Sequence, residues 1–401
     1  MHRLQLHYTL SRTSSPAQVR NPLIDLLQAV SLQGSISGGA RALGLSYRHV
    51  WGELKRWEID LGHELLVWEK GQSARLTDFA HKLMWAERQA QARLAPQIEA
   101  LRAELERSYA LVFDDRVQVV TLYASHDAAL SQLREFALQA DDRARTESNS
   151  IATHAGKTGA TALNHLKHAG KTGQLPQRLH LDIRFTGSVD AIRALNEGRC
   201  VMAGFHTLLR TGNKTLTERT YKPLLQPGQH KIIGFAQRTQ GLMVAKGNPL
   251  GLHSMQDLVI RAARFSNRTL GSGTRVVLDE LLAQGGIAGA DIQGYQRTEP
   301  SHAAVAQAVA AGQCDAGLGI AAAAQQAGLD FVPLADERYH LVCLKSALAQ
   351  PGIQGLLQLL QTPAWQSAIA QIPGYSSIHS GEVLSLRRVL PWWDFARKKR
   401  F

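Results

Sequence analysis

The sequence has few cysteines, few aromatic residues and no long apolar run. Its 401 residues include three cysteines, Cys200, Cys314 and Cys343, an odd number spaced too widely for a local zinc site or a disulfide framework. No segment reaches the roughly 18 apolar residues that a membrane span needs, and residues 1–16 contain no continuous apolar stretch. We therefore expect a cytoplasmic protein with no membrane contact and no metal site.

The composition also excludes disorder and low complexity, because 44% of the residues are hydrophobic and 19% are charged. At about 150 residues per domain, the length allows two or three domains. The formal net charge of +12 favours nucleic acid or another polyanion as a partner, although charge alone does not locate the contact.

A phosphate-binding loop is absent as well. The segment HAGKTG occurs at 154–159 and again at 168–173, but Ile151 and His165 stand where such a loop requires glycine. We interpret residues 141–176, which are polar and rich in glycine and threonine, as a mobile surface insertion.

Residues 1–76 are predicted to form a small DNA-binding domain that begins with two short helices. Asn21 can cap the first helix, which then starts at Pro22. The second helix is expected from about Ser37 to Gly44, where the glycine allows a tight turn.

A third helix capped by Ser46 completes the layout of a helix-turn-helix. Its apolar residues recur at spacings of three and four and are expected to face the core; they are Val50, Trp51, Leu54 and Trp57. The start of such a helix enters the major groove, where Arg48 can bind a guanine edge through two hydrogen bonds. The other residues of this helical region expected to contact DNA are Ser37, Ser46, Tyr47, His49 and Arg56.

The segment LLVWEKGQSARL predicts two short strands joined at Lys70-Gly71, which would form a wing beside the helices. Lys70 and Arg75 are expected to contact the DNA backbone there. The run GSISGGARALGLSYRHVWGELKRWE, followed by ARLTDFAHKL, resembles the winged helix-turn-helix of ModE and LysR-related regulators over about residues 20–85. This resemblance implies binding to double-stranded DNA at an inverted-repeat operator.

Residues 77–110 are predicted to form a long linker helix. Apolar residues follow one face of it at spacings of three and four; they are Leu76, Phe79, Leu83, Ala86, Ala90, Leu94, Ile98, Leu101 and Leu105. Pro96 is expected to kink or divide the helix. We expect the stripe to pair with a second copy in a homodimer or in a tetramer. The alternative is a helix packed only within its own chain.

Residues 111–401 are predicted to form an α/β domain with a mostly parallel sheet, because strand-like and helix-like segments alternate after Val117. The runs HKIIGFAQRTQGLMVAKGNP and LDFVPLADERYHLVCL indicate two extended crossings between two lobes that enclose a cleft. Glu337 and Tyr339 lie on the second crossing, where sensing of closure and a simple hinge role are equally good interpretations.

Several predicted helix starts in this domain carry groups that bind anions. Free backbone N–H groups and the positive end of the helix dipole converge at such positions. The arrangement suits a small oxyanion or a phosphate-bearing ligand. The candidate ligand-binding residues are Ser125, His126, Asp127, Thr186, Gly187, Ser188, Asn267, Arg268, Ser272, Gly273, Thr274, Arg275, Tyr295 and His302.

Segments such as SHDAAL, TGSVDAIRAL, SNRTLGSGTR and SHAAVAQAVAAGQCDAGLGI resemble the periplasmic-binding-protein-like domain that is fused to ModE-type modules or to molybdopterin-biosynthesis proteins. The resemblance covers about residues 117–345 apart from the insertion. It implies a two-lobed ligand-binding fold and an association with molybdenum metabolism.

We therefore expect a one-component transcriptional regulator linked to molybdenum metabolism or molybdoenzymes, with no tightly bound cofactor and no catalytic residues. The expected effector is molybdate, tungstate or a molybdopterin species. The alternative is an enzyme or carrier of molybdenum-cofactor metabolism that uses the same cleft. Such an enzyme would need a base, for which His126 or His302 with Asp127 or Asp315 are the obvious candidates.

Overall fold

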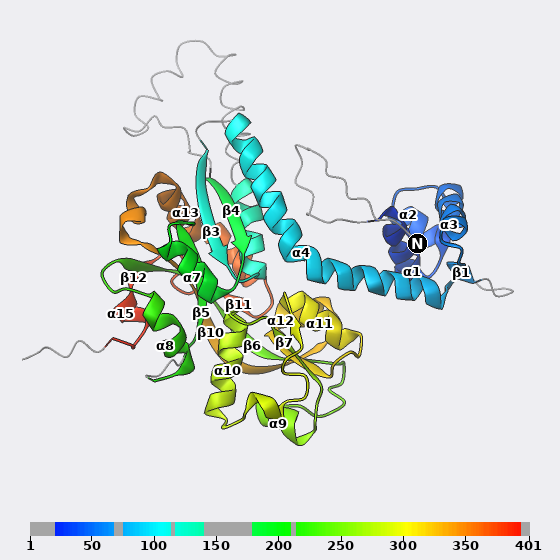
Figure 1. Cartoon of the computed structure of the whole chain (residues 1–401). Helices are drawn as coiled ribbons and strands as arrows, with labels where there is room; N and C mark the ends of the chain where they lie inside the picture. Colours follow the sequence, from blue (N-terminus) through cyan, green and yellow to red (C-terminus); the bar gives the residue numbers. More distant parts are fainter. Residues whose placement is uncertain (1–20, 68–74, 114–116, 140–178, 210–213, 394–401) are drawn as a thin grey trace, which may run out of the picture. The chain divides into compact units, whose positions relative to one another are not determined.

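The computed structural model describes residues 21–67, 75–113, 117–139, 179–209 and 214–393 (Figure 1). The chain divides into two compact units, residues 1–99 and residues 100–401. The predicted insertion at 141–176 and the predicted DNA contact of Lys70 lie outside the described residues.

The first unit contains the three predicted helices and the base of the wing. Asn21 caps the first helix by accepting a hydrogen bond from the backbone N–H of Leu23 at 3.0 Å. The second helix begins one residue before the predicted start, because Ser35 caps it by accepting from Gly38 N at 3.0 Å. The elements are α1 (Pro22–Gln33), α2 (Ile36–Ala42), α3 (Tyr47–Leu61), β1 (Leu66–Val67) and β2 (Arg75–Leu76).

Helix α3 buries a narrower face than the sequence predicts. Val50 and Leu54 are fully buried, and Trp57 is half-buried against the same core. Trp51 is 41% exposed, so the prediction that it faces the core is wrong. The reason is geometric, because one residue rotates a helix by about 100°, and Trp51 therefore points away from its neighbour Val50.

Glu58, near the end of α3, forms hydrogen bonds with the backbone at the start of the wing. Its Oε1 accepts hydrogen bonds from the backbone N–H groups of Leu65 at 2.9 Å and Leu66 at 3.2 Å. Strands β1 and β2 pair in antiparallel register, with Leu66 opposite Leu76. The predicted two-stranded wing base is thereby present.

Helix α4 (Asp78–Phe113) is continuous over 36 residues. Pro96 lies inside it, so the helix is not divided there. Two residues of the predicted apolar stripe are not buried by the rest of the same chain, since Leu94 is 51% exposed and Leu101 is 60% exposed.

The second unit is built around a ten-stranded sheet whose main path is β4-β3-β5-β10-β6-β9-β7-β8. The pairs β3–β4, β3–β5, β7–β8 and β7–β9 are parallel, whereas β6 and β10 run antiparallel to each of their neighbours. The sheet is therefore mixed, and the prediction of a mostly parallel sheet is wrong. The strands are β3 (Gln118–Ala124), β4 (Leu179–Phe185), β5 (Met202–Leu208), β6 (His230–Val244), β7 (Phe265–Arg268), β8 (Thr298–Glu299), β9 (Ala316–Ile320), β10 (Asp330–Leu344), β11 (Tyr375–Ser376) and β12 (Val383–Ser385).

The two long strands β6 and β10 are the predicted crossings. The first part of β10 pairs with the end of β6, and its second part pairs with both β6 and β5. The end of β6 also pairs with β9. Each long strand therefore belongs to two halves of the sheet, one containing β3, β4 and β5 and the other containing β7, β8 and β9 (Figure 1). Strand β6 passes from the first half to the second, and β10 passes back beside it. The two strands are therefore antiparallel, and the sheet is mixed.

Helices cover both halves of this sheet. A helix over residues 128–139 follows β3, and α7 follows β4, so these two parallel strands each lead directly into a helix. The other α-helices of this unit are α8 (Leu216–Tyr221), α9 (Met255–Ile260), α10 (Gly273–Gln284), α11 (His302–Ala310), α12 (Ala321–Gln326), α13 (Pro351–Gln361), α14 (Pro363–Ala370) and α15 (Leu386–Val389), with α7 spanning Ser188–Asn196. None of the helices in the described part of the chain is long and apolar enough to span a bilayer.

Candidate functional site

The start of α3 forms an exposed polar surface on the first unit. Ser46 caps the helix by accepting from His49 N at 3.2 Å, which fixes where the first turn begins. Tyr47, Arg48 and His49 of that turn are all exposed. Their predicted contacts with a DNA groove remain predictions.

Sequence reasoning missed Trp51 as a member of this surface. It follows Tyr47 by four residues, and Tyr47 is 46% exposed while Trp51 is 41% exposed, so the two aromatic rings share one face of α3. Ser37 and Arg75 are also exposed, on α2 and β2. Arg56 forms an exposed ion pair with Glu53 at 2.7 Å, so part of its charge is matched within the helix.

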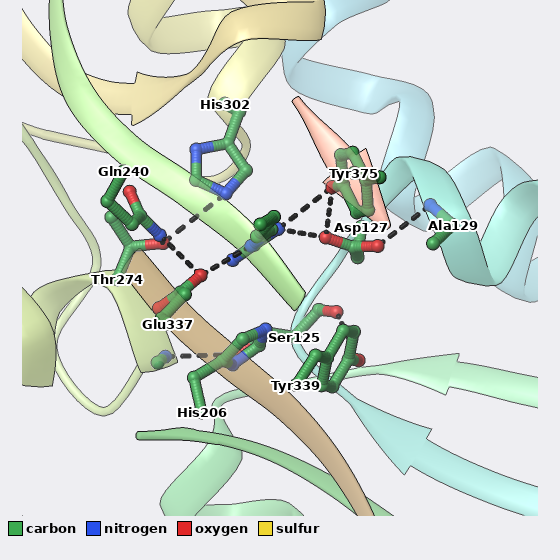
Figure 2. Close-up of polar contacts among 12 residues, drawn as sticks. Ser125, Asp127, Ala129, His206, Gln240, Thr274, His302, Glu337, Tyr339 and Tyr375 are labelled. Atoms are coloured by element: carbon green, nitrogen blue, oxygen red, sulfur yellow. Dashed lines mark hydrogen bonds and ion pairs between the residues drawn. The ribbon is translucent and has the colours of Figure 1, made fainter. Parts of the chain in front are cut away.

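The second unit contains a buried polar cluster where the two halves of its sheet meet. Arg238, on β6, donates to Asp127, which follows β3, and to Glu337, on β10. Arg238 also donates to the Tyr375 hydroxyl at 3.0 Å, and that hydroxyl donates to Asp127 Oδ2 at 2.7 Å (Figure 2). Asp127 and Glu337 are fully buried, and Arg238 is 2% exposed. These contacts join four segments of chain that are far apart in sequence.

The network continues from Glu337 into the second half of the sheet. Gln240 Nε2 donates to Glu337 Oε1 at 2.9 Å and to Thr274 Oγ1 at 3.2 Å. Thr274 Oγ1 is in turn 3.3 Å from His302 Nε2 (Figure 2). Thr274 lies in the first turn of α10 and His302 is the first residue of α11, so two of the predicted helix starts do meet at this cluster.

The helix starts of the first half contribute serines to the same region. Ser125 Oγ is 3.0 Å from Ser188 Oγ and accepts from the backbone N–H of Gly273 at 3.3 Å. Ser188 Oγ is 3.5 Å from His206 Nδ1, and the His206 ring stacks on Tyr339 with centroids 3.9 Å apart. The loops after β3, β4 and β7 therefore converge. That they bind an anion remains a prediction.

Burial keeps the histidines of this cluster uncharged. The pKa values of His206 and His302 lie well below the usual range, first because both rings are buried and then because Arg238 and Arg268 repel a second positive charge. Neutral imidazoles can donate or accept a hydrogen bond but add no charge. Positive charge in the cluster therefore comes from the two arginines.

Arg268, at the end of β7, differs from Arg238 in its contacts. It is 2% exposed, and in the described part of the chain neither its Nε nor its Nη1 has a hydrogen-bond partner. Burial, and then repulsion by Arg238, lower its pKa to about 9, against a smaller opposing effect of Asp127. Burial alone would also lower the pKa of Arg238, but Glu337, Tyr375 and Asp127 together raise it well above its usual value.

Other predicted ligand residues have different neighbours. Arg275 donates its Nε to Asp279 at 3.0 Å and lies over the Tyr295 ring, whose hydroxyl donates to Asp279 at 2.6 Å. Asn267 donates to the Tyr295 carbonyl at 3.1 Å and accepts from the backbone of Arg268. The charge of Arg275 is thus matched by Asp279 within α10.

The remaining predicted residues lie in the loops around the cluster. His126 packs against Phe185 with ring centroids 4.7 Å apart, and Ser272 caps α10 by accepting from Arg275 N at 3.3 Å. Thr186 and Gly187 are half-buried between β4 and α7. Their roles as ligand contacts remain predictions.

Sequence reasoning missed Arg238, Gln240, His206 and Tyr375 as members of the cluster. Arg238 and Gln240 alternate within the polar run 237–240 of β6, which places their two side chains on the same face of the strand. This alternation in the sequence could have predicted that both side chains belong to one polar site. Nothing in the local sequence around Tyr375 indicates that β11 pairs with β6 beside Arg238.

The cluster does not show the pairing that the enzyme alternative requires of His302. This histidine contacts Thr274, while Asp127 is held by Arg238 and Tyr375 and Asp315 pairs with Arg264 at 2.6 Å. Among the residues that the structure describes, no three metal-ligating side chains gather in one place.

Family comparisons assign both units. Residues 23–81 match the family described as bacterial regulatory helix-turn-helix protein, lysR family, and residues 169–361 match the PBP superfamily domain. The predicted combination of a LysR-type helix-turn-helix domain with an α/β domain of the PBP superfamily is therefore confirmed.

This chain is similar to curated relatives and to solved structures. Uncharacterized protein YvgK of Bacillus subtilis (strain 168) is 31% identical over 201 residues, which are 50% of this chain and 64% of that protein, so this chain spans less than two thirds of that relative. "Uncharacterized protein in ferredoxin 2Fe-2S gene 5'region" of Clostridium pasteurianum is 32% identical over 111 residues, 27% of this chain and 98% of that protein. An H2O2-bound OxyR mutant of Corynebacterium glutamicum is 15% identical with a TM-score of 0.41, over 87% of this chain and 93% of that chain.

Proposed function

We propose that this chain, which belongs to the same family as the Clostridium pasteurianum protein and carries a LysR-type helix-turn-helix ahead of a PBP superfamily domain, is a transcriptional regulator that responds to a small anion. In this proposal the first unit binds an inverted-repeat operator as a homodimer. The second unit binds the effector at the buried polar cluster.

The observation that carries the DNA-binding part is the exposed first turn of α3. Tyr47, Arg48 and His49 project from a helix whose opposite side is anchored by Val50 and Leu54, so the surface is presented by a rigid element. Arg48 forms two hydrogen bonds with guanine in this proposal, while Ser46 and Arg56 contact phosphates.

The observation that supports an anionic effector is the convergence of helix starts around buried arginines and neutral histidines. Helix N-termini and guanidinium groups both favour negative charge. Molybdate, tungstate and a molybdopterin species are the candidate effectors, and the choice of molybdenum compounds rests on the sequence resemblance alone.

Binding-site selection from random duplexes tests the proposed function. The full chain is expected to enrich an inverted repeat whose half-sites lie about one helical turn of DNA apart, because a symmetric dimer presents two recognition helices. Enrichment of no common sequence at moderate salt would contradict specific recognition, since nonspecific binding depends on phosphate contacts alone.

A further inference from the structure

We propose that Arg268 binds the negative charge of the effector and that the folded protein keeps this side chain at a cost in its own stability. This inference rests on the proposed function and deepens it, because it names the binding group and limits the chemical class of the ligand. It also gives the two arginines different roles: Arg268 binds the effector, whereas Arg238 holds the residues of the cluster together.

The contacts of the two arginines support this division. The Nε and Nη1 groups of Arg238 donate to two carboxylates and one phenol hydroxyl. The same two nitrogens of Arg268 are buried and have no hydrogen-bond acceptor among the residues that the structure describes. A buried donor that gave up its water without gaining a partner destabilises the folded state. An anion that supplied acceptor oxygens would satisfy both groups.

The charge of Arg268 persists at neutral pH despite this environment. Its pKa is lowered to about 9, which still leaves the guanidinium protonated at pH 7. The neighbouring histidines His206 and His302 are neutral, so they provide hydrogen bonds without adding charge. Arg268 is therefore the charged group of the described cluster that has the most to gain from a bound anion.

Close approaches of the backbone limit the size of this anion. A Cβ atom on Gly187 would lie 2.7 Å from the carbonyl oxygen of Gly271, and one on Gly273 would lie 2.2 Å from His206 Nδ1. The loops after β4 and β7 are thus in direct contact beside the cluster. A compact oxyanion fits this closed arrangement better than a molecule as large as a pterin, which would have to hold these loops apart.

Thermal unfolding and calorimetry of the full chain test the role of Arg268. The variants are Arg268→Gln and Arg268→Lys, with Arg297→Gln as the control, because Arg297 is a half-buried arginine near β7 whose guanidinium already donates to Gln313 at 2.9 and 2.6 Å. The probes are molybdate, tungstate, sulfate and phosphate, compared at equal ionic strength.

We expect at least one of these anions to raise the melting temperature of the unsubstituted protein, because a ligand that binds only the folded state stabilises it. Without anion, Arg268→Gln should melt at or above the unsubstituted protein, since it removes an unsatisfied buried charge. Its affinity for the anion should fall about 10- to 100-fold, as expected for losing charge-assisted hydrogen bonds. Arg268→Lys should retain part of the affinity, and Arg297→Gln should retain nearly all of it.

Two results would overturn the inference. One is an Arg268→Gln variant that melts well below the unsubstituted protein and keeps its anion-induced shift, which would make Arg268 a structural residue. The other is an unsubstituted protein that none of the four anions stabilises. Operator binding separates this inference from the proposed function. If the anion shift depends on Arg268 but no operator is bound, the regulator proposal fails while the role of Arg268 stands.

Discussion

The hydroxyl of Tyr375 donates a 2.7 Å hydrogen bond to Oδ2 of Asp127, across 248 positions of the chain. Strand β11 makes this contact possible by pairing with β6 so that Tyr375 lies opposite Arg238. The segment after α14 therefore returns to the centre of the domain and completes the buried cluster.

Replacing Tyr375 with phenylalanine should destabilise the second unit by about 1–3 kcal/mol, because the buried Asp127 loses a donor and Arg238 loses an acceptor. Urea unfolding followed by fluorescence measures the difference. Tyr295→Phe is the control, since Tyr295 also donates to a carboxylate, that of Asp279, but is only half-buried. Equal losses for the two variants would contradict the importance of the buried network.

Replacing Arg48 with alanine should weaken binding to the selected operator by about 1–3 kcal/mol and relax the sequence preference at one position of each half-site. The exposed side chain should contribute little to folding, so the melting temperature should stay nearly unchanged. Fluorescence anisotropy with the operator and with an unrelated duplex gives both affinities. An unchanged ratio of the two affinities would remove Arg48 from base recognition.

Substitutions of Trp51 and Leu54 should affect different properties, because Leu54 is buried in the core and Trp51 is exposed on the same helix. Leu54→Ala should lower the free energy of unfolding of the first unit by about 2–5 kcal/mol, because it leaves a cavity in the core. Trp51→Ala should change that free energy by less than about 0.5 kcal/mol while weakening operator binding, since the ring is on the exposed face. A strongly destabilised Trp51→Ala variant would show that the indole is part of the core.

Stability should fall as the pH drops below about 6.5, in part because of His340. Its Nε2 lies 2.9 Å from Thr207 Oγ1, and burial, with a smaller effect of Arg338, lowers its pKa to about 3. The unfolded chain therefore binds a proton that the folded chain does not, and this residue alone should reduce stability by about 1.4 kcal/mol per pH unit below about 6.5.

The variant His340→Gln tests this effect, because glutamine can keep a hydrogen bond to Thr207 but does not titrate. Its free energy of unfolding should fall less between pH 7 and pH 5.5 than that of the unsubstituted protein. Glu337, whose pKa burial raises, affects stability in the opposite sense in both proteins, so it cancels from the comparison. Parallel pH profiles would show that His340 does not stay neutral in the folded state.

Local signals predicted the helical first unit well. The caps Asn21 and Ser46 are present because a short polar side chain can satisfy free backbone N–H groups at a helix start without any distant partner. The spacing of Trp51 to Leu54 predicts that Trp51 faces the core. The prediction is wrong because the angular position of Trp51 around the helix axis places its ring outside the buried face. Helical spacing near the edge of an apolar stripe does not decide on which side a large ring lies.

The buried cluster was only partly predictable for a different reason. The serines and histidines at the helix starts were found because a strand followed by a helix creates a local anion-binding geometry. Arg238 and Tyr375 belong to the cluster through strand pairing between distant segments, which no local pattern specifies. The same long-range pairing makes the sheet mixed, because β10 must return beside β6.

The central claim is that an anion bound in the second unit changes how the first unit binds DNA. The most direct test is a titration of the selected operator with the full chain, in the presence and absence of molybdate or tungstate, with sodium chloride adjusted to the same ionic strength. The account predicts that the Kd for the operator changes about 5-fold or more with the anion that stabilises the protein. An operator Kd that stays the same at saturating anion would contradict it.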